Sequence, residues 1–558
     1  MKTILYHSNN SRAFTGFGKN CKNILKYLEK TGKYKIIEFA NGQPWGHPSL
    51  DNKPWTCQGS LPADQSALNS NPERARAAGY GAEMIDQAIK TYKPDIYIGV
   101  EDIWGMNGYW NKPWWNKIAS MIWTTLDSQP ILQTAIDAAP KTKHFYTWAS
   151  FAQKDMNKMG HDHVKTLHGS IDTKDFYRLP DEHRAFLRQR FELQDSYIVG
   201  FVFRNQLRKS VPNILDGFKI FKKDCPKAKL LLHTHWSEGW DIPRLLEEKS
   251  INVQDVLTTY FCNHCNNYLI APFQGQEQKC PYCGTEKSLN TTNVSAGVDE
   301  EQLNEIYNLM DVYCHPFTSG GMEIPIYEAK LTELITLVTN YSCGEDSCTS
   351  ESGGFPLEWA EYREPGTQFI KASTYASSIA KQLKKVWSMK SEKVRELGRR
   401  AREFTINNYS VEVIGKKLEK IIDDIPETDY DYDFGEKTVA KDLVDFLDDG
   451  ERIAVVIPES AGDVLWINCM ISNLKSNYPN HDIYVFTNPK YYDYIDSHED
   501  VHKVLPYAPE IDNLHFLEGV SKHKGYFDIA FLPHYGTQKF HNYHHNGKDK
   551  TQFDLCHM

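Results

Sequence analysis

The strongest constraint on the fold is a regular alternation of short apolar runs with segments of helical spacing. Residues 2–6, KTILY, have the length and composition of a buried strand, and turn-forming residues follow them in SNNSRAFTGFG. Apolar side chains then recur at helical spacing, at Cys21, Ile24, Leu25 and Leu28. The later runs KYKIIEFA and KPDIYIGV repeat the strand pattern. Strands that alternate with helices predict a parallel sheet covered by helices.

A second alternating series begins at SYIVGFVFR, and a third, shorter one begins at RIAVVIPE. A chain of 558 residues is too long for one core, since domains usually hold roughly 100–200 residues. Between these two series, IIDDIPETDYDYDFGEKT is acidic and poor in apolar residues, which is typical of a linker. We therefore expect an α/β protein with two doubly wound, Rossmann-like domains and a further half-domain. We expect the first Rossmann-like domain at residues 1–175, completed by a returning helix at 401–422, and the second at residues 176–400. The second domain contains an insertion at 258–290. A linker at 423–447 then leads to the half-domain at 448–558.

Four cysteines form the most specific local motif. Cys262 and Cys265 lie in FCNHC, and Cys280 and Cys283 lie in KCPYCG. Two CxxC pairs at this separation have the spacing of a tetrahedral thiolate zinc site, and four protein ligands leave no open position for catalysis. We expect a structural Zn²⁺ in a zinc ribbon at 258–290, in preference to four unrelated buried cysteines. The ribbon either fixes a long loop, which is the interpretation we favour, or contacts a macromolecular acceptor.

Composition restricts the cellular setting and the partners. No apolar stretch is long enough for a signal-peptide core or a membrane span. We therefore expect a cytoplasmic protein, which for a viral protein means the host cytoplasm. Its twelve cysteines are then better interpreted as reduced thiols and metal ligands than as a disulfide framework. The formal net charge of −10 argues against a general polyanion binder.

A segment of more than thirty residues carries a family resemblance. The stretch DEEQLNEIYNLMDVYCHPFTSGGMEIPIYEAK resembles the donor-site signature of glycosyltransferase family 4, whose members have the two-domain GT-B fold. The resemblance places Gly321 and Glu323 in the glycine turn at the donor, and Glu328 in the first turn of the following helix. There a carboxylate can accept hydrogen bonds from the two hydroxyls of a nucleotide ribose. The alternative is that Glu328 is only a charge stabilised by the helix dipole.

Two further segments are similar to the same family. In FVFRNQLRKS, Arg204 and Lys209 match the Arg and Lys that hold the diphosphate, and two fixed cations can stabilise that leaving group without a metal. By themselves, two basic residues after a strand would usually be a solvated surface. The loop with Gly16 and Gly18 resembles the glycine-rich loop of the acceptor domain, whose amides can contact a phosphate or the transferred sugar. In LHGSIDTKDF, Asp172 lies in a segment like the family's connection between the domains.

The sequence also departs from the family pattern. The family usually carries two glutamates eight positions apart, but Gly320 stands eight positions before Glu328, and Glu323 stands where the family has Gly. Where the family commonly places a His, WTTLDSQP offers Asp127, either as a catalytic base that contacts the sugar or as a helix cap. The resemblance implies retention at the anomeric carbon, and these changes bear directly on it.

Two more features concern the acceptor and the C-terminal region. Five tryptophans lie in residues 104–123; they can stack on sugars or extruded bases, although core packing is the interpretation we favour. From residue 451, the sequence resembles the N-terminal half of lipopolysaccharide heptosyltransferases, glycosyltransferase family 9, with Asp463 matching a catalytic Asp or capping its helix. A lone acceptor-type half cannot complete transfer, so we expect binding, docking or homo-oligomerisation there.

These motifs together predict a glycosyltransferase that takes a nucleotide sugar as donor. Residues 1–175 would bind the acceptor and residues 176–400 would bind the donor. The acceptor is a hydroxyl group, and a hydroxymethylated pyrimidine in viral DNA is one candidate. A cell-surface glycan, a lipid-linked saccharide and a protein side chain are the alternatives. A catalytically silent scaffold of the same fold is the competing hypothesis, and Gly320 favours it.

Overall fold

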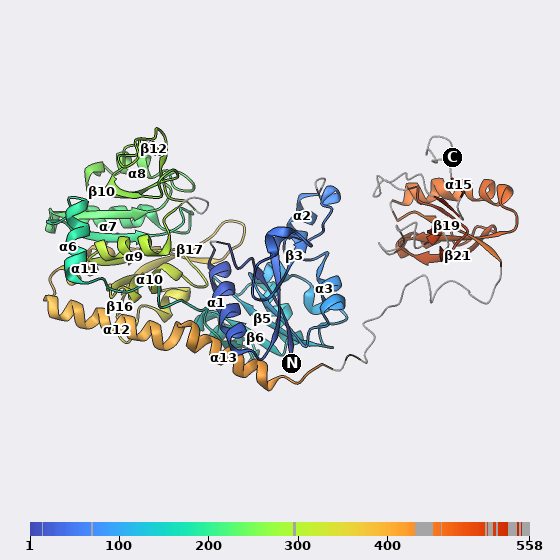
Figure 1. Ribbon diagram of the computed structural model, residues 1–558, viewed down its shortest axis with the longest axis horizontal. Coiled ribbons are helices and arrows are strands. Elements are labelled where there is room, and N and C mark those ends of the chain that lie inside the picture. Colours follow the sequence, from blue (N-terminus) through green and yellow to red (C-terminus); the bar gives the residue numbers. More distant parts are fainter. Residues whose placement is uncertain are drawn as a thin grey trace. The chain divides into compact units, whose positions relative to one another are not determined.

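The computed structural model of the chain separates into two compact units, Met1–Tyr430 and Asp431–Met558, which are described one at a time (Figure 1). It describes residues 1–558 with the exception of 14, 69–70, 294–296, 429, 431–449, 459, 508–510, 512–516, 521–522, 534–543, 546–547 and 550–558. Most of the predicted linker at 423–447 therefore lies outside the described residues. No described helix is long and apolar enough to cross a membrane.

The first unit opens with a seven-stranded parallel sheet, as the strand and helix alternation predicts. Its strand order is β3-β2-β1-β4-β5-β6-β7, and each neighbouring pair is parallel. The strands are β1 (Thr3–Asn9), β2 (Lys35–Pro44), β3 (Thr56–Leu61), β4 (Ile96–Val100), β5 (Ala119–Thr124), β6 (His144–Thr147) and β7 (Lys165–Thr166). The helices between them are α1 (Gly16–Thr31), α2 (Pro72–Gly79), α3 (Ile85–Tyr92), α4 (Gln133–Ala138) and α5 (Ser150–Lys158).

Helix α1 shows why the local sequence folds as it does. The Thr15 hydroxyl accepts a hydrogen bond from the Gly18 amide at 3.0 Å, which caps the first turn. The helix ends at Gly32, whose φ of +65° closes the last turn in the left-handed conformation. Its apolar face packs into the core under β1 and β4, formed in part by Cys21, Ile24, Leu25 and Leu28. These are the four positions that the helical spacing predicts.

The second sheet of this unit confirms the second Rossmann-like series. Its order is β12-β13-β10-β9-β8-β14-β15-β16, with β11 also paired to β10. Strands β8 to β10 and β14 to β16 pair in parallel, whereas β11, β12 and β13 form antiparallel pairs. The strands are β8 (Tyr197–Val202), β9 (Ala228–His233), β10 (Val256–Cys262), β11 (Tyr268–Pro272), β12 (Glu277–Gln278), β13 (Leu289–Thr291), β14 (Val312–His315), β15 (Thr336–Thr339) and β16 (Gly354–Leu357).

Helices cover this second sheet and enclose a separate core. The largest buried side chains of that core include Phe201, Phe218 and Trp236. The antiparallel strands β11 to β13 belong to the cysteine segment, so the insertion extends the sheet edge and has its own small core. The helices are α6 (Asp181–Arg190), α7 (Val211–Asp224), α8 (Ile242–Glu248), α9 (Glu300–Leu309), α10 (Ile324–Leu331) and α11 (Ala376–Trp387).

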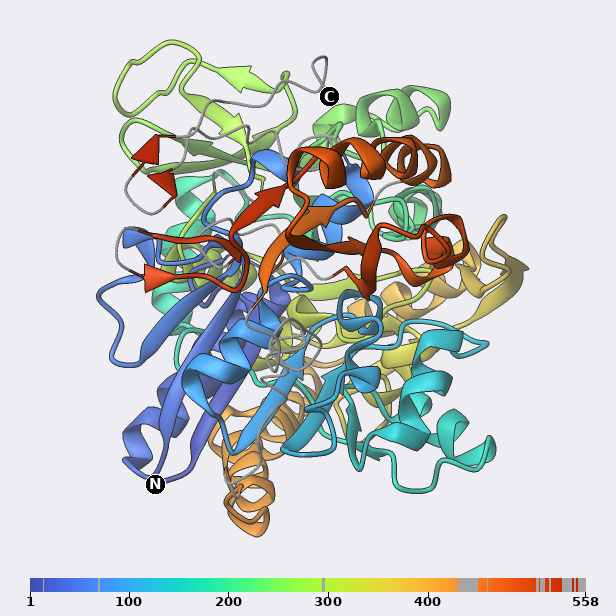
Figure 2. The ribbon, with the colours of Figure 1, turned by 90° about the vertical axis from the view of Figure 1, so that its right-hand side faces the viewer.

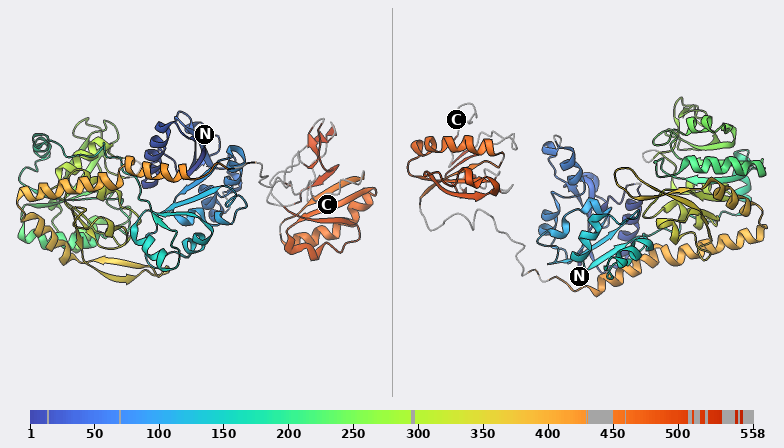
Figure 3. Two further views of the ribbon diagram at one scale, coloured as in Figure 1. Left: turned by 90° about the horizontal axis from the view of Figure 1, so that it is seen from below. Right: turned by 180° about the vertical axis from the view of Figure 1, so that it is seen from behind.

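A pair of helices and a hairpin connect the two sheets of the first unit. Helices α12 (Ser391–Tyr409) and α13 (Val411–Asp424) follow one another from the second sheet to the first (Figure 3), where Ile414, Leu418 and Ile422 enter the first core. A hairpin of β17 (Trp359–Arg363) and β18 (Ile370–Thr374) leaves the second sheet, and Ile370 forms an isolated bridge with Gln129 of the first half.

The C-terminal unit contains a four-stranded parallel sheet in the order β21-β20-β19-β24. Helix α15 (Ala461–Asn477) lies over one face of this sheet, where Val464, Ile467 and Ile471 are buried (Figure 2). Asp463 forms a capping box with Ser460, so a helix-capping role is present there. The strands are β19 (Glu451–Val456), β20 (His481–Thr487), β21 (Val501–Pro506) and β24 (Ile529–Phe531).

Candidate functional site

The candidate site lies where the two halves of the first unit meet, at the carboxyl ends of their parallel strands. Open α/β sheets place their binding loops at these ends. Gly321, which follows β14, packs directly against the loop that follows β5. A Cβ atom on Gly321 would come within 2.3 Å of Thr125 Cβ and 2.7 Å of Asp127 Oδ1. Glycine is therefore required at this position for the two halves to approach one another.

A buried ion cluster centres on Glu323. Its carboxylate accepts hydrogen bonds from Arg208 and Lys209, and His315 Nε2 lies 3.1 Å from Glu323 Oε2. Burial opposes ionisation of Glu323, but Arg208 and Lys209 hold its pKa well below the usual value. Burial lowers the pKa of Lys209 to about 8, with Arg208 adding to the fall and Glu323 opposing it. Glu323 thus bridges the two cations that precede α7 and offsets one of their two positive charges.

Asp127 faces this cluster from the first half. The Asp127 residue is exposed, but its carboxylate lies against Gly321, where a Cβ would come within 2.7 Å of Oδ1. Desolvation of the carboxylate raises the pKa of Asp127, with Glu323 adding to the rise and Arg208 and Lys371 opposing it. A carboxylate whose pKa is raised is a stronger proton acceptor than an ordinary one, which suits a general base.

Lys371 completes the junction, and no sequence motif indicated it. Its ammonium group, carried by β18, donates to Ser319 Oγ at 2.8 Å and to Ser128 Oγ at 3.0 Å. Burial lowers its pKa, while Glu364 and Asp127 oppose that fall. Sequence reasoning also missed Arg208, although it lies beside Lys209 in the segment that resembles the family. The single ammonium group of Lys371 therefore connects a loop of the first half, at Ser128, with a loop of the second half, at Ser319.

Arg204 lies apart from the Glu323 cluster. Its side chain is half exposed and pairs with Glu238, with 3.0 Å between Nη2 and Oε1. The structure therefore brings Lys209, Gly321, Glu323 and Asp127 together, while Arg204 has a different partner. Its assignment to the diphosphate stays a prediction.

Glu328 is buried between the halves. Helix α10 begins at Ile324, so Glu328 lies in the second turn of the helix and not in the first. Tyr307 donates a hydrogen bond to Glu328 Oε2 at 2.8 Å, and Lys19 Nζ lies 3.1 Å from Oε1. Both carboxylate oxygens therefore have a partner, one from each half.

Gly16 and Gly18 lie in the first turn of α1 and approach their neighbours closely in two different ways. A Cβ on Gly18 would lie 2.3 Å from Ala13 O, so the loop itself excludes a side chain there. A Cβ on Gly16 would lie 3.3 Å from Ile324 Cδ1, which shows how closely the start of α1 approaches α10. A hollow of about 180 Å³ lies beside this contact. Its lining includes Lys19, Lys22, Ser170, Phe176, Glu300 and Glu328.

Two more carboxyl groups lie at the end of β4 and were not expected. Burial, with Asp102 next, raises the pKa of Glu101 to about 7. Burial, with Asp127 next, raises the pKa of Asp102 to about 6. Glu101 accepts hydrogen bonds from Asn9 and Asn41, and Asp102 accepts one from Thr125 at 2.7 Å. Asp102 and Asp127 are therefore electrostatically linked across neighbouring strand ends.

The four cysteines form one compact set. All four sulfur atoms lie within 4.8 Å of one another, and two of the pairs, Cys262 with Cys283 and Cys265 with Cys280, are 3.7 Å apart. Tetrahedral Zn–S bonds of about 2.3 Å require sulfur separations of about 3.8 Å. The set therefore fits a tetrahedral zinc ion, as the CxxC spacing predicts.

Four of the five tryptophans of residues 104–123 are in the core. Trp110, Trp114, Trp115 and Trp123 are each at most 5% exposed. Trp104 is the exception, and the Arg76 guanidinium lies 4.4 Å from its ring centroid. Core packing, the interpretation favoured from the sequence, is confirmed for these four, so the segment is not a set of exposed stacking platforms.

The fold of the chain is similar to that of several known structures. No protein-family model and no curated protein matches the sequence. Sucrose-phosphate synthase from Thermosynechococcus elongatus is similar at 13% identity and a TM-score of 0.55, covering 76% of this chain and 98% of that chain. A glycosyltransferase from Rickettsia africae gives 15% identity, a TM-score of 0.52, and the same coverages of 76% and 98%.

A third similar structure contains a bound UDP-sugar derivative. The trehalose-6-phosphate protein of E. coli, bound with UDP-2-fluoro glucose, gives 11% identity and a TM-score of 0.52, with 76% and 100% of the two chains covered. At these identities the similarity establishes the fold. The chain has the GT-B fold of glycosyltransferases over 76% of its length, with a four-cysteine cluster and a further parallel sheet in the C-terminal unit.

Proposed function

We propose that the protein transfers a sugar from a nucleotide-sugar donor to a hydroxyl acceptor, with retention at the anomeric carbon. The observation that carries this proposal is the meeting of Arg208, Lys209 and Lys371 with Asp127 at the junction of two GT-B halves. Fixed cations at such a junction can stabilise the charge that develops on a departing nucleoside diphosphate. The UDP-sugar analogue bound to the similar E. coli protein supports a donor of this class.

Each side chain receives a role in this proposal. Lys209 and Arg204 hold the diphosphate, and Arg208 is added to them because it shares the Glu323 carboxylate with Lys209. Glu328 accepts hydrogen bonds from the ribose hydroxyls once the Lys19 ammonium group has moved away from the Glu328 carboxylate. Asp127 accepts the proton of the acceptor hydroxyl, a role that suits its raised pKa.

Donor binding also requires the junction to open. The hollow beside Glu328 measures about 180 Å³, whereas small-molecule sites usually measure roughly 300–1,000 Å³. The Lys19 to Glu328 ion pair and the Lys371 bridge hold the two halves together across this space. Binding must therefore exchange these contacts for contacts with the donor.

The remaining parts have supporting roles. We propose a structural Zn²⁺ at Cys262, Cys265, Cys280 and Cys283, where it would hold the strands β10 to β13 together. The C-terminal unit, which resembles half of a heptosyltransferase, would bind, dock or oligomerise. Acceptors worth testing are hydroxymethylated DNA, a glycan, a lipid-linked saccharide and a protein.

A catalytically silent scaffold is the second candidate. Gly320 provides no carboxylate where the family has its first glutamate. In addition, Arg208 and Lys209 both pair with Glu323, and Lys19 pairs with Glu328, so each charged group that would bind a donor already has a partner within the protein.

The test is to incubate the full chain with a panel of nucleotide sugars and to measure release of the nucleoside diphosphate. We expect one donor to be hydrolysed slowly without an acceptor, with release lost in the Arg208→Ala and Glu328→Gln variants. Hydroxymethylated DNA, unmodified DNA and glycans then serve as acceptors for labelled sugar. Absence of release and of binding for every donor in calorimetry would establish the scaffold instead.

A further inference from the structure

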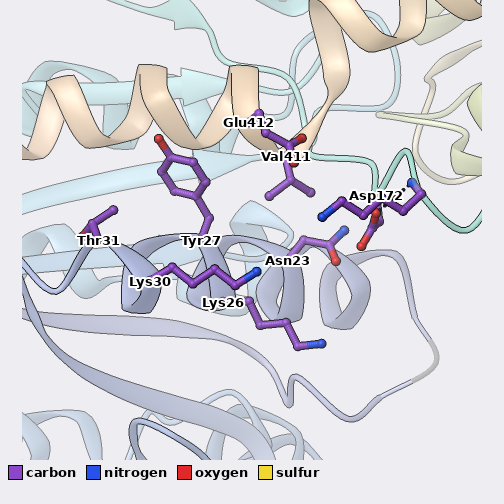
Figure 4. A pocket seen from close by; sticks show the side chains of 9 residues that line it. Asn23, Lys26, Tyr27, Lys30, Thr31, Asp172, Val411 and Glu412 are labelled. Atoms are coloured by element: carbon purple, nitrogen blue, oxygen red, sulfur yellow. Dashed lines mark hydrogen bonds between the residues drawn. The ribbon is translucent and has the colours of Figure 1, made fainter.

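A second hollow lies on the outer side of α1, next to the one that reaches Glu328. It measures about 340 Å³ and is bounded by α1, the segment after β7 and the start of α13 (Figure 4). This volume falls within the lower part of the range for small-molecule sites. Asn23, Lys26 and Asp172 line both hollows, so the two are neighbours.

Three lysines line this second hollow. Lys26 and Lys30 lie one turn apart on α1, and Lys174 approaches from the segment after β7. Figure 4 shows the Lys26 and Lys30 side chains extending in the same direction along the helix. In the part of the chain that the structure describes, none of the three ammonium groups has an ion-pair partner or a side-chain hydrogen bond. In a protein of net charge −10, three unpaired cations around one hollow indicate an anionic ligand.

The hollow is also lined by hydrogen-bond acceptors, among them two carboxylates. The Asp172 carboxylate is fixed by the Lys174 amide, which donates to Oδ1 at 3.0 Å. Glu412 lies across the hollow at the start of α13, and Asn23 lines the hollow from α1 (Figure 4). Carboxylate and amide oxygens are the acceptors that sugar hydroxyls use, whereas lysine ammonium groups suit a phosphate.

We propose that this hollow binds a sugar monophosphate, with its phosphate on Lys26, Lys30 and Lys174 and its hydroxyls on Asp172, Glu412 and Asn23. The carboxylates argue against a nucleic-acid strand, because they would repel a second phosphate. The volume suits one sugar ring with its phosphate. No step of the proposed glycosyl transfer requires this site. Its ligand would contact α1, α13 and the segment after β7 at once and hold them together.

The experiment measures binding by isothermal titration calorimetry on the full chain, with a panel of hexose and pentose monophosphates. Inorganic phosphate, the unphosphorylated sugars and a single-stranded oligonucleotide are the comparison ligands. We expect at least one sugar phosphate to bind more tightly than phosphate or its free sugar. The Lys26→Gln/Lys30→Gln variant should weaken that binding about tenfold or more, since hydrogen bonds to charged groups are lost.

The matched control is Lys416→Gln/Lys420→Gln, which removes the same charge from α13 outside the hollow and should leave the affinity unchanged. Glu328→Gln should also leave it unchanged, which separates this site from the donor site. The proposal is overturned if no sugar phosphate binds, if the α1 variant binds as the control does, or if the oligonucleotide binds more tightly than every sugar phosphate.

Discussion

Lys19 on α1 and Glu328 on α10 form an ion pair between the two halves of the GT-B unit, with 3.1 Å between Nζ and Oε1. Burial leaves Glu328 only 3% exposed, and the Tyr307 hydroxyl occupies its other oxygen. The carboxylate that the sequence assigns to the donor ribose is therefore engaged by the protein itself. Glu328 raises the pKa of Lys19, so this contact favours the charged form of the lysine.

Replacing Glu328 with Gln should weaken donor binding about tenfold to a hundredfold, because a charged hydrogen-bond acceptor for the ribose is lost. Titration calorimetry with the donor identified by the panel measures this change. Glu300→Gln is the control, since Glu300 lines the same hollow without contacting Lys19 in the described structure. Equal affinities for the two variants would remove Glu328 from the donor site.

Replacing Arg208 with Ala should lower kcat/KM by about a hundredfold or more, the cost typical of losing a fixed charge at the developing negative charge. Arg204→Ala should lower it less, because Arg204 is half exposed and pairs with Glu238. Release of nucleoside diphosphate measures both. Arg244→Ala, which removes an exposed pair with Glu248, is the control. A normal rate for Arg208→Ala would contradict the assigned role.

Replacing Gly321 with Ala should hold the two halves apart, because the new Cβ would meet Thr125 Cβ at 2.3 Å. We expect turnover to fall by about tenfold or more, since a displacement of about 1 Å can cost a hundredfold. Small-angle X-ray scattering should show a larger radius of gyration. In Gly79→Ala the added Cβ meets nothing within 4 Å, and both measurements should match those of the wild type.

The purified protein should contain about one zinc ion per chain, as four cysteine ligands predict. Elemental analysis measures the metal content, and the Cys280→Ser variant should lose it and melt several degrees lower. Cys469→Ser changes an exposed cysteine of the C-terminal unit and should keep both zinc and Tm. Full zinc content in the Cys280→Ser protein would show that the four-cysteine set is not the site.

Glu101 should destabilise the folded protein progressively as pH rises from about 4 to 7, because its pKa is about 7 in the folded protein and about 4.3 when unfolded. Between these values the folded state holds the extra proton, so a rise in pH favours unfolding through this group by up to about 3 kcal/mol. The buried His7 and His315, whose pKa is lowered to about 4, act in the opposite direction, so the comparison is between two proteins. The Glu101→Gln variant cannot ionise, and its Tm should rise relative to that of the wild type over this range. Parallel Tm curves for the two proteins would contradict this expectation.

Local sequence patterns predicted those features that depend on neighbouring residues. The strand and helix alternation predicted both sheets, because periodicity reports which face of each element is buried. The CxxC spacing likewise predicted the four-cysteine set. In contrast, the Lys371 contact with Ser128 joins residues separated by 243 positions, and the spacing of a single sequence contains no record of such a contact.

The same reason explains why the sequence identified only some of the residues in the Glu323 cluster. The family resemblance indicated Arg204 and Lys209 from their separation in one loop. Which cation reaches Glu323 depends on how that loop packs on the turn after β14, and there Arg208 and Lys209 make the contacts. Four of the five tryptophans of residues 104–123 were assigned correctly to the core, because large aromatic side chains between strands usually enter it.

The chain crosses between the two sheets of the first unit twice, and the two crossings are hydrogen-bonded to each other. Ile171 donates its amide to Tyr409 O at 2.8 Å, and the Val411 amide donates to Ile171 O at 3.1 Å. Fastened at this point, the halves cannot slide along one another, and the motion left to them is rotation about it. Ile171 and Ser410 would then mark the axis of a hinge, around which a small turn separates Gly321 from Asp127.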